Sequence, residues 1–268
     1  STTSKSGSRN GKRSRCRSFD PRTPALAGVL RFPGRTGVHE DPRHRREAKI
    51  ELDKTVVGIE LTLISIIQGL ALAVLAGAAV QPMLHLEWQT WPYILTGLLV
   101  ILIFWSRSLI HTLSFIGWPL EFGHTFGYFG ATLIEAAALT QVSDPQAWFA
   151  LNACYALAVW GLYAWDLRVV QRQSHDFGTP EERLLYEDIV RDQRENIVVL
   201  MPLAVAFQGV SWWMVHRYPD TLLQGRWHLL LIGLTVLFSL YYLHGGVQLL
   251  KRRRDWILAR QAQERREG

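Results

Sequence analysis

Ionisable side chains inside apolar stretches define the chemistry that this sequence offers. Glu60, Arg107 and His244 fall at one predicted depth, near the membrane face that receives most of the lysines and arginines. A charge in hydrocarbon is tolerated when it is paired, so we expect Glu60 and Arg107 to form a buried ion pair. The alternative is that each of the two side chains extends separately to the membrane surface.

A second carboxyl lies deeper in the predicted membrane. Glu135 shares its depth with Asn152, and the sequence places no cationic residue at that level. Because an unpaired charge is costly in hydrocarbon, we expect Glu135 to be protonated and name it the candidate proton or cation site. The alternative is a neutral carboxyl that hydrogen-bonds Asn152. Gln68 and Gln208 occupy the middle depth, where we expect each amide to hydrogen-bond a neighbouring helix.

The sequence carries no catalytic or metal-binding pattern beside these residues. It has no glycine-rich phosphate loop, nucleophile elbow or paired His/Asp metal motif, so we predict that the protein is not an enzyme. Cys16 and Cys154 lie in unlike surroundings, and neither has a metal-ligand partner at useful spacing. Haem would need two facing histidines, which His111 and His244 could supply. We predict bound lipids and no cofactor, with haem or a pigment left open.

Six apolar segments position these side chains. A membrane helix needs about 20 mostly apolar residues, and Trp91–Ile110 meets this length most clearly. Six such segments between residues 50 and 250 leave too little polar surface for a water-soluble bundle. The sequence therefore predicts an all-α, polytopic membrane protein, a bundle of six transmembrane helices with spans at about 55–80, 91–110, 125–141, 147–166, 196–216 and 227–250.

Two connections are predicted to be more than loops. Residues 111–124 are apolar but interrupted by a glycine and a proline, so we expect a short interfacial or re-entrant segment. Residues 179–196 begin with helix-capping signals at Thr179 and form a predicted surface helix on the basic side. We expect this helix to run along the membrane surface and then to continue into the fifth span.

Both ends of the chain are basic. Residues 1–49 contain 13 Lys/Arg against 4 Asp/Glu and have the composition of a disordered arm, and the tail 251–268 contains 7 against 3. Lysine and arginine gather on the cytoplasmic side of membrane proteins, or on the matrix or stromal side in an organelle. We therefore place both termini there, in a bacterial inner membrane or an organellar membrane. The candidate contacts to lipid headgroups or partner subunits are Arg13, Arg15, Arg17, Lys251, Arg252, Arg253 and Arg254.

Two functions fit these features. The favoured one is a non-catalytic integral membrane subunit with a structural or assembly role in a larger complex, for example a respiratory or photosynthetic one. Its basic arm and tail would contact other membrane-protein subunits; no nucleic-acid-reading motif accompanies the charge, so nucleic acid is not an expected partner. The alternative is a small channel or transporter for protons or cations that uses Glu60, Arg107 and Glu135. A polar cavity that reaches Glu135 would favour transport.

Overall fold

The computed structural model describes residues 42–114, 122–172 and 180–267. Contacts divide the chain into two units, Ser1–Arg46 and Glu47–Gly268, and the helical bundle belongs to the second unit. The described residues form helices joined by short turns, with no strand among them. The predicted all-α class is therefore confirmed.

Two predicted features lie outside the described residues. One is most of the basic arm, with Arg13, Arg15 and Arg17, and the other is the centre of the predicted interfacial or re-entrant segment, residues 115–121.

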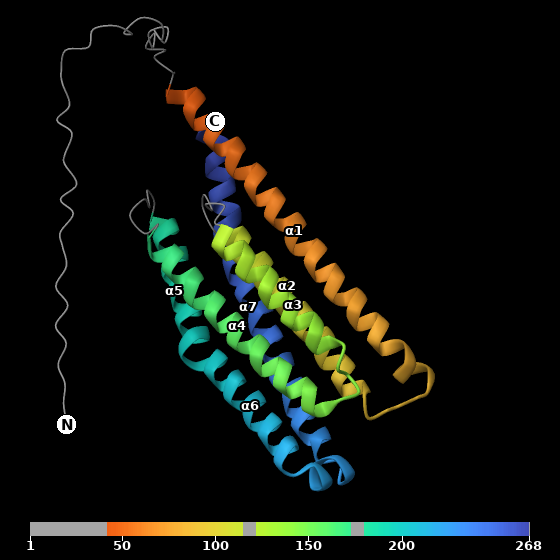
Figure 1. Ribbon diagram of the computed structural model, residues 1–268. Helices are drawn as coiled ribbons and strands as arrows, with labels where there is room; N and C mark the ends of the chain where they lie inside the picture. The colour runs from red at the N-terminus through yellow and green to blue at the C-terminus, as the bar shows by residue number, and fades with distance from the viewer. Residues whose placement is uncertain (1–41, 115–121, 173–179, 268) are drawn as a thin grey trace, which may run out of the picture. The chain divides into compact units, whose positions relative to one another are not determined.

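Seven α-helices and two short π-helices follow one another along the chain within the described ranges (Figure 1). Each long helix runs in the opposite direction to the one before it, except where α5 leads into α6. The elements are α1 (Pro42–Leu84), α2 (Trp91–Ser114), α3 (Phe122–Leu139), α4 (Pro145–Arg172), α5 (Pro180–Glu195), η1 (Asn196–Leu200), α6 (Met201–Arg217), η2 (Asp220–Gln224) and α7 (His228–Glu267).

Five helical stretches are long and apolar enough to cross a membrane. The protein is therefore a multi-pass membrane protein by the length and composition of its helices. Helix α3, which corresponds to the predicted third span, has 18 residues and is not among these five. The five stretches are Thr55–Leu84, Trp91–Leu113, Pro145–Arg172, Arg183–Arg217 and His228–Trp256.

The faces that the helices turn outward are apolar. Ile66 on α1, Leu133 on α3 and Leu237 on α7 are between 64% and 68% exposed. Water would penalise so much uncovered apolar surface, whereas lipid tails would not.

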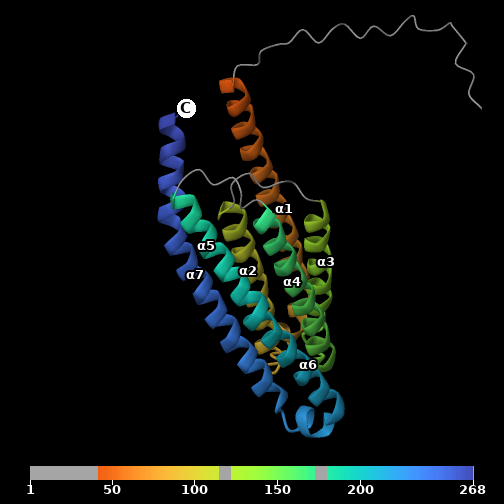
Figure 2. The same ribbon diagram turned by 90° about the vertical axis from the view of Figure 1, so that its left-hand side faces the viewer.

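Helix α5 continues into α6, as the sequence predicted for residues 179–196 and the fifth span (Figure 2). The link is the π-helical turn η1, which ends at Leu200, two residues before Pro202. Proline has no N–H to donate to the carbonyl of Val198, so the α-helical pattern is interrupted at this point. The Nε1 of Trp160 donates a hydrogen bond of 2.9 Å to the nearby carbonyl of Ile197. As a result, α5 extends the line of α6 and packs against the end of α4.

Helix α4 packs closely against α3 on one side and α6 on the other, and α2 packs closely against α7. We call the end of the bundle that carries Arg107, Asp166, Asp192 and Arg253 the basic end. The opposite end is closed by a buried apolar cluster that we call the far-end core. Its members are Ala71, Leu75, Tyr93, Ile101, Leu139, Val142, Trp148, Phe149, Val215, Leu222 and Ile232.

Gly97 allows α2 to approach its neighbours within the far-end core. A Cβ at this position would lie 2.7 Å from Leu139 Cδ2, 3.1 Å from Leu75 Cδ1 and 3.4 Å from Trp148 Cη2. We expect Gly97→Leu to lower the free energy of unfolding by about 1–3 kcal/mol through overpacking. Gly77→Leu is the matched control, because nothing lies within 4 Å of its added Cβ. Thermal unfolding in detergent measures the stability of both variants. An equal loss of stability in Gly97→Leu and Gly77→Leu would contradict the packing role of Gly97.

Candidate functional site

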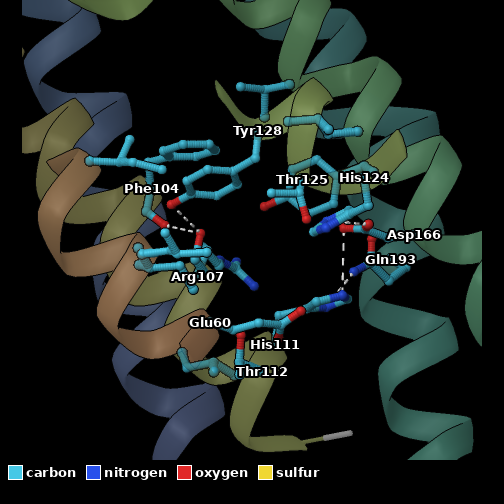
Figure 3. Close-up of a pocket in the computed structure, with 18 of the residues that line it drawn as sticks. Glu60, Phe104, Arg107, His111, Thr112, His124, Thr125, Tyr128, Asp166 and Gln193 are labelled. Carbon is cyan, nitrogen blue, oxygen red and sulfur yellow. Dashed lines mark hydrogen bonds and ion pairs between the residues drawn. The ribbon is translucent and has the colours of Figure 1, made fainter. Parts of the chain in front are cut away.

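A cavity of about 100 Å³ lies at the basic end, and we call it the polar cavity (Figure 3). Both acidic and basic side chains line it, although it lies among helices long and apolar enough to cross a membrane. In the close-up, Glu60 and Arg107 lie on one side of the cavity and His124 and Asp166 on the other. Its polar lining comes from six helices: Glu60, Arg107, Ser108, His111, Thr112, His124, Thr125, Tyr128, Tyr163, Asp166, Asp192, Gln193 and Arg253.

An ion network closes one wall of the polar cavity. The Nη1 of Arg107 donates to both carboxylate oxygens of Asp192 at 3.1 Å. The Nε of Arg253 donates to Asp188 Oδ2 at 2.8 Å, and its Nη2 lies 3.8 Å from Asp192 Oδ2. Asp188 and Asp192 are one turn apart on α5, so both face the two arginines from the same side. The network joins α2, α5 and α7.

The predicted ion pair between Glu60 and Arg107 is replaced by the pair between Arg107 and Asp192. Glu60 lines the same cavity, but no ion pair joins it to Arg107 among the described residues. The reason is the position of α5, which places an aspartate directly beside the guanidinium. His244 does not join this layer, because it is exposed and its Nε2 lies 3.4 Å from Gln248 Nε2 on the same helix.

The basic tail also differs from the expectation of a uniformly exposed contact surface. Lys251, Arg252 and Arg254 are exposed, whereas Arg253 is 2% exposed and belongs to the ion network. Arg253 therefore faces the inside of the bundle, because α5 supplies Asp188 as its partner.

A carboxylate bridges two histidines on the opposite wall. Asp166 Oδ1 lies 2.9 Å from His124 Nε2, and Asp166 Oδ2 lies 3.5 Å from His111 Nε2. The Nε2 of Gln193 lies 3.3 Å from His111 Nδ1. In the part of the chain that the structure describes, no three His, Cys, Asp or Glu side chains are arranged to hold a metal ion. His111 also does not face His244, the second histidine that a haem would have needed.

Glu135 lies two helical turns beyond the cavity-lining Tyr128 on α3. Tyr128 lines the cavity, and its hydroxyl lies 3.1 Å from Ser108 Oγ. The Nε2 of Gln68 donates to Glu135 Oε2 at 3.5 Å. Glu135 is 1% exposed, and its Oε1 has no hydrogen-bond partner among the described residues. The expected partner Asn152 instead donates to the carbonyl of Trp148 at 2.9 Å.

Beyond Glu135, the side chains of the far-end core fill the space between the helices. Leu139, Trp148 and Phe149 of the far-end core are each at most 2% exposed. Tyr93 packs edge-on against Trp148, and its hydroxyl lies 2.8 Å from His228 Nδ1. The polar cavity thus lies on the basic-end side of Glu135, and apolar side chains lie on the other.

The carboxyl and imidazole groups of the polar cavity and the carboxyl of Glu135 can take up and release protons, and buried carboxylates and histidines serve as proton relays in membrane proteins. The residues that sequence reasoning passed over are His124, Asp166 and Asp192. Comparisons with protein-family models, with curated protein sequences and with solved structures found no match to this chain.

The ion network leads to a test of which carboxylate pairs with Arg107. We expect Arg107→Gln to lower the free energy of unfolding by about 1.5–3 kcal/mol, because Asp192, whose side chain is 22% exposed, then keeps only the longer contact of 3.8 Å to Arg253. Arg254→Gln should have little effect, since the Arg254 side chain is 73% exposed. Adding Asp192→Asn to Arg107→Gln should recover part of the loss, and adding Glu60→Gln should not. Denaturant unfolding in detergent micelles measures the free energy of unfolding of all four variants. If adding Glu60→Gln restored the stability that Arg107→Gln removes, Glu60 would be the partner of Arg107 instead.

Proposed function

We propose that this protein transports protons through a bundle of six membrane spans. The observation that carries the proposal is the buried Glu135, which lies two turns from the cavity-lining Tyr128 on α3 and accepts a hydrogen bond of 3.5 Å from Gln68 Nε2. The polar cavity is the entry from one side of the membrane. Glu135 is the group that accepts and releases the proton.

The charge of Glu135 supplies the driving interaction. No cation lies within ion-pair distance of its carboxyl among the described residues, so the neutral acid is the favoured form in hydrocarbon. Release of the proton creates a charge that the surrounding residues do not balance. The protein then favours any arrangement that brings water or a cation to the carboxylate. An opening of the far-end core would do this, and the present arrangement corresponds to a state open toward the basic end.

Helix α3 is the sixth span in this proposal. Its 18 residues extend about 27 Å at 1.5 Å per residue, close to the roughly 30 Å of a hydrocarbon core. It packs along α4, turns Phe126 and Leu133 outward and carries Glu135 on its buried side. The excess of lysine and arginine at the basic end supports a cytoplasmic position for that end.

The role of a structural subunit in a larger membrane complex stays a prediction. It rests mainly on the basic arm, which lies largely outside the described residues, and on the exposed lysine and arginines of the tail. The polar cavity and the buried Glu135 favour transport over this role.

Proton flux tests the proposal directly. Vesicles that contain the purified chain and an internal pH-sensitive dye should acidify when a valinomycin-generated potential, negative inside, is imposed. Glu135→Gln should reduce the rate to that of protein-free vesicles, because the amide cannot release a proton. Glu87→Gln is the matched control, since Glu87 is exposed in the turn after α1. Equal flux for wild type and Glu135→Gln would refute the assignment, as would wild-type vesicles no faster than protein-free ones.

The sixth span is tested by chemical labelling. In a background without Cys16 and Cys154, single cysteines are placed at Ser143, Glu87 and Arg172 and treated with a membrane-impermeant maleimide. We expect Ser143→Cys and Glu87→Cys to react from the same side and Arg172→Cys from the other. Reaction of Ser143→Cys from the side of Arg172→Cys would show that α3 and α4 do not cross as proposed.

A further inference from the structure

A second cavity, of about 310 Å³, lies between α2, α4, α6 and α7, and we call it the apolar cavity. Its volume falls at the lower end of the range for small-molecule sites. Hydrophobic and aromatic side chains form most of its wall, among them Val100, Ile103, Phe207 and Phe238. Along α4 the lining extends from Asn152 to Tyr163, which corresponds to roughly 16 Å along the helix axis. The cavity therefore suits an elongated apolar molecule.

Gln208 on α6 is one of several polar side chains in this wall; two others, Asn152 and Thr235, hydrogen-bond carbonyls of their own helices. Its side chain lines the apolar cavity, the residue is 8% exposed, and its Oε1 has no hydrogen-bond partner among the described residues. A buried amide oxygen without a donor is unfavourable, and hydrocarbon supplies none. A bound molecule with a hydrogen-bond donor would satisfy this oxygen.

The polar groups at the other end of the apolar cavity already have partners. The hydroxyl of Tyr163 lies 2.9 Å from that of Tyr242, and Tyr242 donates to Asn196 Oδ1. Arg107 is held by Asp192 and lies over the Tyr242 ring. These groups satisfy one another, so Gln208 is the better position for a polar headgroup.

The apolar cavity reaches the outer surface of the bundle between α6 and α7. Leu203 on α6 and Leu234 on α7 line it, and they are 55% and 45% exposed. Helices α6 and α7 are not among the closely packed pairs, so side chains rather than backbones bound this edge. In a membrane this surface faces lipid tails, and an occupant would enter from the hydrocarbon phase.

We propose that the apolar cavity binds a single-chain amphiphile from the bilayer whose headgroup carries a hydrogen-bond donor, a hydroxyl or a protonated acid. The headgroup donates to Gln208 Oε1, and the chain lies along α4 toward Tyr155 and Val159. This site does not depend on proton transport through Glu135, because Gln208 is on another helix and lines a different cavity.

A photoreactive probe tests the site on the full chain in detergent. A diazirine-bearing twelve-carbon alcohol should label lining peptides of α6 and α7, with 1-dodecanol and methyl dodecyl ether as competitors. The alcohol donates a hydrogen bond and the ether does not. We expect the alcohol to compete about fivefold to tenfold better, the usual worth of one hydrogen bond. Equal competition on the wild-type chain would overturn the proposal without any variant.

Two substitutions and one control locate the interaction. Gln208→Leu should abolish the advantage of the alcohol while labelling persists, because the cavity keeps its shape and loses its acceptor. Ser239→Phe should remove the labelling itself by filling the cavity. Gln68→Leu is the control, a buried mid-span glutamine outside the apolar cavity whose Oε1 also has no partner among the described residues. An advantage that survives Gln208→Leu, or labelling that survives Ser239→Phe, would mean that the probe binds elsewhere.

Discussion

The ion network of Arg107, Arg253, Asp188 and Asp192 is the interaction on which the basic end of the bundle depends. It joins three helices that are far apart in the sequence, α2, α5 and α7. Burying charges is costly, and the cost is offset here because each arginine meets a carboxylate at short range. The result is a fixed wall beside which Glu60, His111, His124 and Asp166 can share one polar cavity inside an otherwise apolar bundle.

The two ends of the bundle differ in their physical chemistry. At the basic end, charged side chains prevent close apolar packing and leave a cavity, whereas at the far end Tyr93, Trp148 and Phe149 pack edge to face around one another. Aromatic rings in such arrangements fill space efficiently and exclude water. The polar cavity therefore lies on one side of Glu135 and the apolar far-end core on the other.

The two mid-depth glutamines show how surroundings determine what a residue does. Both are buried, and in both the amide oxygen lacks a partner among the described residues. Gln68 donates a hydrogen bond to the Glu135 carboxyl and so belongs to the polar surroundings of that carboxyl. Gln208 faces an apolar cavity with no carboxylate in its lining, where a donor from outside the chain would complete its hydrogen bonding.

The sequence by itself determined the membrane class, the helical architecture and the positions of most apolar spans, because hydrocarbon requires long uninterrupted apolar helices. It also identified Arg107, Glu135 and Gln68 as residues that need partners. Partner identity was decided by the tertiary structure. Asp192 follows the buried Leu185 and Ile189 at helical spacing, so the sequence indicates that it lies on the inner face of α5. Its pairing with Arg107 depends on the direction in which α5 extends from α6, which the sequence does not give. Contacts between distant helices depend on that geometry, and local sequence patterns do not encode it.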